Sequence, residues 1–287
     1  MTFENVIAFI IISLLSGLRS IFLKKQAKCE FGSKQFWWIL SFCFFAGSIP
    51  LSFFIKTIPL NAIILVIVGA VLLVVSFSCF SKGLQDGDIN ICSLLFSMGF
   101  LFPTISGLIF WNESFTKFKL LGMILAIVAI VVSGLKNKTN PTVKGKKKGF
   151  FIPCLCSMLA TGGFGIVLTV FRKKCETNEL AAFLFATWFL VAVICFFVGC
   201  ISKKKDTPPQ KSTIIFSALA GICYGLSVYL QSLLIGAVDV TIVFPVANIG
   251  VLISTVLLSL IFCKQKLTVR SSIVVVIGML AILVLNL

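Results

Sequence analysis

The residue best suited to binding chemistry is an arginine that lies inside an apolar segment. Arg19 falls in the run from Ser16 to Ile21, and a charge at membrane depth costs roughly 2.5–3.5 kcal/mol unless it faces a cavity or a partner. Facing a cavity, its guanidinium can bind a carboxylate or a phosphate through two parallel hydrogen bonds. The alternative is that the side chain reaches back to the membrane interface, about four residues or roughly 6 Å away.

Uncharged polar side chains recur at spacings of three and four residues in three other apolar segments. This spacing places each set on one face of a helix. The three sets are Asn90, Ser93 and Ser97; Tyr224, Ser227 and Gln231; and Thr241, Pro245 and Asn248. Together with Arg19, we expect the polar members of these sets to bind a substrate in a shared central cavity. The alternative is hydrogen bonding between helices, worth roughly 0.6 kcal/mol per pair on average.

Two prolines lie inside apolar segments, Pro103 and Pro245. Each removes a backbone donor and tends to bend a helix, and a bend at membrane depth frees carbonyl oxygens that can face a substrate. We therefore expect both prolines to act as helix kinks with a role in gating, with simple packing as the equal alternative.

Chemistry that needs an acid, a base or a metal has little support in this sequence. The chain has no His, its eleven Cys lie mostly in apolar runs, and no carboxylate sits near the middle of an apolar segment. Glu113, for example, lies at a segment end, where Lys117 is its expected partner. Intramembrane catalysis would need a nucleophile with a base, a metal cluster or paired acids, so we expect no enzyme, metal site or cofactor. A proton relay usually employs an embedded acid or His, which favours a facilitator or exchanger.

The composition is that of an integral membrane protein. Hydrophobic residues make up 59% of the 287 and charged residues 12%, with a mean hydropathy of +1.13, whereas soluble domains run about 45–50% and about 25%. A membrane span needs about 20 mainly apolar residues. Ten segments qualify: 6–23, 36–55, 60–80, 89–110, 119–135, 150–171, 180–201, 213–235, 240–262 and 269–287. The predicted fold class is an all-α membrane protein with ten transmembrane helices.

The two halves of the chain echo each other. Residues 21–29 resemble residues 169–175, and residues 87–90 resemble residues 238–241. Five apolar segments fall in each half, and because five is odd, the second copy enters the membrane from the opposite side. This construction is common in carriers that open alternately to each face. The predicted units are a five-helix repeat at 1–135, a Lys-rich linker at 136–148 and a second five-helix repeat at 149–287.

The net charge of +16 is concentrated in alternate loops. Eighteen of the 25 Lys and Arg lie in the odd-numbered loops, six lie at the other segment ends, and Arg19 is inside a segment. The positive-inside rule then places the odd loops in the cytoplasm and both termini outside. The charge is explained in this way without a nucleic-acid partner. We expect a multi-pass protein of the cell membrane (plasma or inner), with membrane lipid and a small-molecule substrate as partners, as a monomer or a homodimer.

Short motifs at corresponding places in the two halves resemble the drug/metabolite transporter superfamily, in its ten-helix branch with two EamA-type repeats. In the first half, Pro103 precedes the run Glu113–Thr116, which is similar to that family's E-x-L-T junction between its fourth and fifth helices, and Gly122 follows. In the second half, Pro245 resembles a proline of the family's ninth helix. The junction recurs at residues 264–268, where Gln265 replaces the usual Glu.

The resemblance implies a secondary transporter that moves a small metabolite, such as an amino acid, amine or drug-like solute, by alternating access. It also implies a central pocket built from helices of both repeats. A lipid-carrier flippase is the alternative, because some small relatives in the superfamily have that activity. Members of this branch usually have both termini in the cytoplasm, which opposes the charge count, so the orientation stays open.

Overall fold

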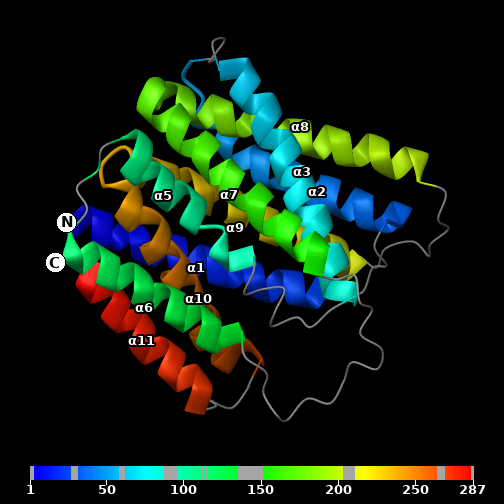
Figure 1. The fold of residues 1–287 in the computed structure, drawn as a ribbon. Coiled ribbons are helices and arrows are strands. Elements are labelled where there is room, and N and C mark those ends of the chain that lie inside the picture. Colours follow the sequence, from blue (N-terminus) through cyan, green and yellow to red (C-terminus); the bar gives the residue numbers. More distant parts are fainter. Residues whose placement is uncertain are drawn as a thin grey trace.

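A computed structural model describes residues 3–26, 32–57, 62–86, 96–111, 113, 116–134, 151–202, 211–263 and 269–285. All regular elements in this part of the chain are helical (Figure 1). The α-helices are α1 (Phe3–Gln26), α2 (Lys34–Ser52), α3 (Ile63–Asp86), α5 (Leu101–Phe110), α6 (Lys117–Gly134), α7 (Phe151–Lys174), α8 (Leu180–Ile201), α9 (Lys211–Ile235), α10 (Val240–Cys263) and α11 (Val269–Leu285). A short 3₁₀ turn, η2 (Thr177–Glu179), precedes α8.

The helices follow the predicted apolar segments closely. α8 has the predicted bounds, and α10 ends one residue later than expected. α3 extends to Asp86, beyond the predicted end at residue 80, and carries the exposed Lys82 on its last turns. A long cationic side chain is tolerated there because its stem lies along the apolar surface while its charge reaches water.

The exterior of the bundle is apolar, as expected of a protein surrounded by lipid. Six of the described helices, α1, α2, α3, α7, α8 with its preceding turn, and α9, are long and apolar enough to cross a membrane by length and composition. Residues 96–110, and residues 240–255 within α10, are shorter apolar helical stretches. Large apolar side chains such as Ile64 (74% exposed) and Phe197 (60% exposed) face outward, where a soluble protein would form an adhesive surface. The predicted number of ten spans stays a prediction.

Helices from the two halves pack against one another in corresponding pairs. α1 lies along α9 and α10, and α3 lies along α7. α2 contacts both α8 and α9, while α6 lies beside α11 at the periphery (Figure 1). If α1 corresponds to α7 and α3 to α9, the pair α1–α9 is the counterpart of the pair α7–α3.

Two glycines on α9 let it approach α2 very closely. A Cβ atom at Gly221 would collide with the carbonyl group of Cys43, and one at Gly225 would collide with the carbonyl oxygen of Gly47. Small residues permit this kind of contact between membrane helices. The G-x-x-x-G spacing of α9 therefore serves packing within the chain.

The helix that carries Pro103 is interrupted just before the proline. A turn at Gly99 and Phe100 separates residues 96–98 from α5. Pro103 cannot donate to the carbonyl of Gly99, and the amide of Phe102 donates to it instead at 3.3 Å, so the helix tightens locally. α7 accommodates the interruption with Gly162, which faces Phe102 and Gly99. Pro245, in contrast, lies within the continuous helix α10.

Candidate functional site

The guanidinium of Arg19 lies against two aromatic rings in the interior. Its central carbon is 3.9 Å from the ring centroid of Tyr224 on α9 and 5.2 Å from that of Phe77 on α3. Cation–π contacts of this kind are worth about 0.5–1 kcal/mol when exposed and about 2 kcal/mol when desolvated. Arg19 is partly buried, and its charge is directed towards α3 and α9.

Four aromatic side chains form a cluster around this contact, which we call the aromatic cluster: Phe44, Phe77, Trp188 and Tyr224. The Tyr224 ring lies 5.4 Å from Trp188, 5.6 Å from Phe77 and 6.3 Å from Phe44. Most of these ring pairs are edge-to-face or tilted, which aromatic quadrupoles favour. The four residues come from α2, α3, α8 and α9, so both halves of the chain contribute.

Trp188 carries a polar atom without a partner. Its side chain is fully buried, and its indole Nε1 has no hydrogen-bond partner in the part of the chain that the structure describes. Leaving a buried donor unsatisfied costs about 1–3 kcal/mol. The ring is accommodated by Gly47, where a Cβ atom would lie 3.0 Å from Trp188 Cδ1. The close approach of α2 to α9 thus also positions the aromatic cluster.

Arg19 has no acidic partner within the described residues. No carboxylate forms an ion pair with it, and the described acids all lie at or near helix ends. The contacts of the guanidinium within the described part of the chain are instead with the ring faces of Tyr224 and Phe77.

The remaining predicted site residues lie in different environments. Ser227 is buried and its hydroxyl is 2.6 Å from that of Ser16 on α1. The Asn248 amide donates to the Phe244 carbonyl of its own helix at 2.9 Å, and Gln231 is partly buried on α9. The structure therefore brings Arg19 into contact with Tyr224, and Ser227 into contact with α1. Among the described contacts, none joins Gln231 or Asn248 to Arg19 or to Ser227.

The fourth-segment set is described only in part. Ser97 is partly buried, next to Phe96, whose ring is 6.3 Å from that of Phe77, which places Ser97 near the aromatic cluster. Asn90 and Ser93 lie outside the described residues, as do Gln265 and the predicted linker at 136–148.

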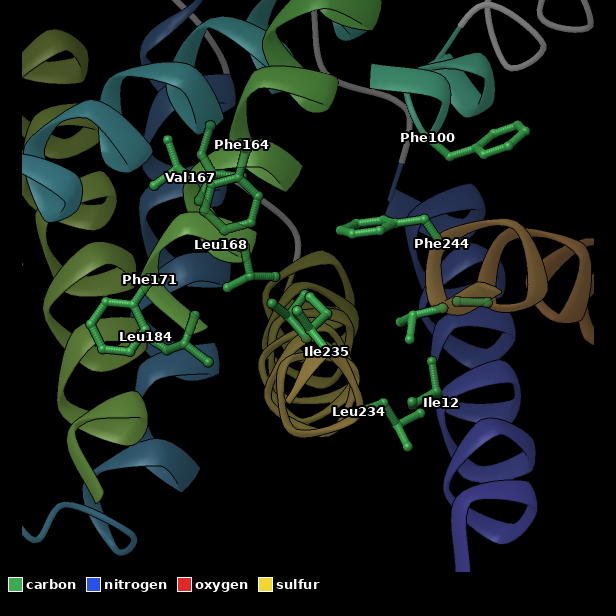
Figure 2. Packing of buried hydrophobic residues seen from close by; sticks show 14 of the residues in the cluster. Ile12, Phe100, Phe164, Val167, Leu168, Phe171, Leu184, Leu234, Ile235 and Phe244 are labelled. Atoms are coloured by element: carbon green, nitrogen blue, oxygen red, sulfur yellow. The ribbon is translucent and has the colours of Figure 1, made fainter. Parts of the chain in front are cut away.

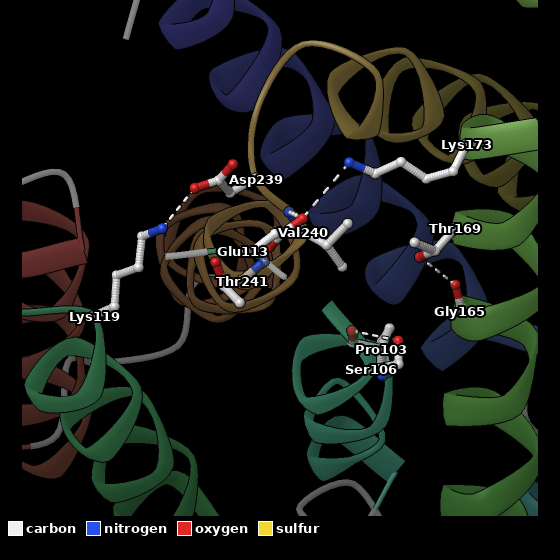
Figure 3. Close-up of polar contacts among 10 residues, drawn as sticks. All are labelled: Pro103, Ser106, Glu113, Lys119, Gly165, Thr169, Lys173, Asp239, Val240 and Thr241. Atoms are coloured by element: carbon white, nitrogen blue, oxygen red, sulfur yellow. Dashed lines mark hydrogen bonds and ion pairs between the residues drawn. The ribbon is translucent and has the colours of Figure 1, made fainter. Parts of the chain in front are cut away.

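Thr241 lies at a second polar region, at the start of α10. Both carboxylate oxygens of Glu113 accept hydrogen bonds there, from the backbone amides of Val240 (2.9 Å) and Thr241 (3.0 Å) (Figure 3). A carboxylate suits this position because the first amides of a helix lack partners and carry partial positive charge. The Thr241 hydroxyl is buried without a hydrogen-bond partner among the described residues.

Ion pairs surround this cap. Lys119 Nζ on α6 donates to Asp239 Oδ2 at 2.5 Å, and Lys173 Nζ on α7 lies 3.8 Å from Glu113 Oε1 (Figure 3). We call Glu113, Lys119, Lys173 and Asp239 the end cluster. It links the first half of the chain to the second. The expected pair between Glu113 and Lys117 is wrong, since the start of α10 and Lys173 occupy the Glu113 carboxylate.

The E-x-x-T motif of the first half now has a physical account. Glu113 caps α10, and Thr116 caps α6, because its hydroxyl accepts from the amide of Lys119 at 3.2 Å. A Thr at this position typically stabilises a helix by about 1 kcal/mol. One short segment thereby fixes the start of two helices.

Sequence reasoning missed the end cluster and most of the aromatic cluster. Glu113 was identified only as a junction residue with Lys117 as its expected partner, and Asp239 only as part of the repeated segment 238–241. The sequence pattern does not distinguish Phe44 and Phe77 from the other Phe among the chain's 30. It does not single out Trp188 either.

The helical fold and the apolar exterior define a multi-pass membrane protein, and known proteins sharpen that class. Residues 5–135 match the model of the EamA-like transporter family. The predicted resemblance to the drug/metabolite transporter superfamily is thus confirmed over these residues, and the match points to a membrane transporter of that type.

Structural similarity covers nearly the whole chain. A solved crystal structure is similar to this protein, with a TM-score of 0.76 and 12% sequence identity. The alignment covers 99% of this chain and 96% of the chain in that structure. At that identity the likeness shows the fold alone. No curated protein gives a significant match to the sequence.

Proposed function

We propose that the protein is a secondary carrier that moves a small organic solute across the cell membrane by alternating access. The observation that carries this proposal is the position of Arg19 and the aromatic cluster, whose helices α1, α2 and α3 belong to the first half and α8 and α9 to the second. Carriers built from inverted repeats bind substrate between the repeats near mid-membrane. The predicted units 1–135 and 149–287, joined by the linker 136–148, are the two bodies that rock.

The end cluster supports a conformation that is closed at one end. Glu113 and Lys119 from the first half hold the start of α10 and Lys173 from the second half. Next to them, buried apolar side chains of α7, α9 and α10 meet, among them Leu168, Ile235 and Phe244 (Figure 2). Opening this end requires these contacts to separate, so the end cluster is the proposed gate.

The distribution of acids supports a facilitator or exchanger. The described carboxylates lie at or near helix ends, and those of Glu113 and Asp239 are held in a helix cap and an ion pair. Such groups are poorly placed to carry a proton through the centre. Gln231, Ser97 and Asn248 remain proposed substrate contacts, together with the undescribed Asn90 and Ser93, and Pro103 and Pro245 remain proposed hinge points.

The test of alternating access is the accessibility of a buried site on α10. Val243 is 0% exposed, and we expect Val243→Cys, in a background without native Cys, to react slowly with a membrane-impermeant maleimide. Adding a transported solute should change that rate, because the two conformations exchange. Asn178→Cys in the exposed turn η2 is the control and should react quickly in both conditions. Unchanged labelling of Val243→Cys under active counterflow in proteoliposomes would overturn the proposal.

A lipid-carrier flippase is the second candidate, and one observation favours it. An apolar groove of about 540 Å³ lies between α2, α8 and α9, lined by Trp38, Phe42, Phe45, Phe189 and Phe196 among others. It suits an acyl chain, but the Ser41 hydroxyl on its wall already donates to the carbonyl of Ala192, and none of the described charged side chains lines it to hold a headgroup. A scramblase assay with fluorescent lipid in the same proteoliposomes separates the two functions.

A further inference from the structure

We infer that the Arg19 site takes an organic monoanion, a carboxylate attached to an aromatic or aliphatic body, in preference to an amine or a zwitterion. This inference deepens the proposed function and rests on it. Its first support is charge. Arginine stays protonated under all ordinary conditions, and a partly buried cation without a counter-ion is unfavourable. A bound anion supplies the partner that the described residues do not.

The second support is geometry. Tyr224 and Phe77 lie against the guanidinium at 3.9 Å and 5.2 Å from its central carbon. Ring faces attract the charge, but they accept no strong hydrogen bonds. Donor groups on the guanidinium therefore stay available, and their planar fork matches the two oxygens of a carboxylate. Contact with the two rings also restrains the guanidinium, so less conformational freedom is lost when the anion binds.

The third support is the rest of the aromatic cluster. Phe44 and Trp188 extend the apolar wall around Tyr224. Small-molecule sites combine such walls with a few convergent polar groups. The Nε1 atom of Trp188 is a buried donor without a partner in the described part of the chain, a group that an acceptor on a ligand would satisfy.

Among the described residues, this site offers no partner for the ammonium group of an amine or a zwitterion. A ligand ammonium needs a carboxylate or a set of acceptors, and it is repelled by Arg19. The described acids lie at or near helix ends, away from the Tyr224 ring in the middle of α9. Four probes with one body test this: 3-phenylpropionate, phenylalanine, 3-phenylpropanamide and phenethylamine share a phenyl ring and a short chain and differ in charge.

Binding is measured first, by thermal shift and calorimetry on the purified full chain in detergent. We expect 3-phenylpropionate to bind roughly tenfold to a hundredfold more tightly than the amide, since a charge-assisted pair replaces a neutral contact. Phenylalanine and phenethylamine should bind more weakly still. Equal or tighter binding of the amide or of phenethylamine by the unmodified protein would overturn the inference, and this result needs no variant to fold.

Variants then assign the contact to Arg19. Arg19→Gln should lose the preference for the acid over the amide, and Arg19→Lys should keep part of it because the charge remains while the planar fork is lost. Lys174→Gln removes a charge from the exposed end of α7 and should bind like the original. An Arg19→Gln protein that keeps the full preference for the acid contradicts the assignment.

Transport of the same four probes in proteoliposomes distinguishes the two proposals. Arg19-dependent binding of the acid without uptake or counterflow of any probe would leave the anion site standing and contradict the carrier. Saturable uptake of the amine or the zwitterion, but not of the acid, would leave the carrier standing and contradict the anion site.

Discussion

Two basic side chains of the interior have opposite surroundings. Lys119, in the end cluster, is 7% exposed and its charge is met by Asp239. Arg19, next to the aromatic cluster, has ring faces and no carboxylate among the described residues. A cation whose counter-ion is built into the chain holds structure together. A cation whose counter-ion must come from elsewhere is suited to binding.

The same difference extends to the neighbouring groups. In the end cluster, both carboxylate oxygens of Glu113 accept hydrogen bonds from amides of α10, and Lys173 lies nearby. The neighbouring Thr241 hydroxyl is the one buried polar group there without a hydrogen-bond partner among the described residues. In the aromatic cluster, the Trp188 donor and the Arg19 charge both lack a polar partner in the described chain. The comparison predicts that changes in the end cluster act mainly on stability and on opening, whereas changes next to the aromatic cluster act on ligand binding.

The largest effect on stability is expected where the counter-ion of Lys119 is removed. Asp239→Asn removes the carboxylate that pairs with the buried Lys119 ammonium, and we expect a loss of roughly 3 kcal/mol. Lys119→Met should cost less, because the Asp239 side chain is 44% exposed and water can solvate it. Equilibrium unfolding in mixed detergent and SDS measures both. The comparison fails if the lysine variant is the less stable of the two.

The second effect concerns the cap on α10. Glu113→Ala removes the acceptor of two backbone amides, and we expect a loss of roughly 2 kcal/mol, the upper range for a helix cap. Glu113→Gln keeps one acceptor oxygen and should lose about half as much. Glu4→Gln, at the exposed start of α1, is the matched control and should stay within a few tenths of a kcal/mol. A Glu113→Ala protein as stable as this control would show that the cap does not hold the bundle closed.

These two regions also show what the sequence could and could not predict. The helices were predictable because long apolar runs are bounded by charged or turn residues, as at α8 between Glu179 and Ser202. Arg19 was predictable as a special residue because a charge inside an apolar run is conspicuous. Tyr224 was singled out by its hydroxyl, although its ring face is what contacts Arg19.

The missed features depend on contacts between distant parts of the chain. Glu113 and Val240 are separated by 127 residues, and no helical period relates them. Phe77 and Trp188 differ from the other aromatic residues only in where α3 and α8 place them. Helix packing, through contacts such as Gly47 with Gly221, decides that placement. Local sequence patterns therefore predicted the helices and the importance of Arg19. Which aromatic residues lie next to Arg19 depends on the tertiary fold.

A third prediction concerns the ring that lies closest to Arg19. Tyr224→Leu removes the aromatic face but keeps an apolar side chain, and we expect 3-phenylpropionate binding to weaken by roughly fivefold to thirtyfold, equivalent to about 1–2 kcal/mol. Tyr224→Phe keeps the face and should bind within a few-fold of the original. Tyr229→Leu is the control on the same helix, since Tyr229 stacks on Phe54 outside the aromatic cluster. Similar losses in both leucine variants would mean that general packing, and not the contact with Arg19, explains the effect.

The smallest effect is expected at a contact that belongs to neither cluster. The Ser227 hydroxyl is shared with Ser16 on α1 and joins α9 to α1 at 2.6 Å, whereas the Ser232 hydroxyl donates only to Val228 of its own helix. Ser227→Ala should cost roughly 0.6 kcal/mol, the average for a hydrogen bond between membrane helices, and Ser232→Ala less. If Ser227→Ala instead leaves stability intact but weakens ligand binding more than Tyr224→Leu does, the binding region extends along α9 beyond the aromatic cluster. The sequence-based expectation that Ser227 contacts substrate would then be correct, and the division between holding and binding regions would have to be redrawn.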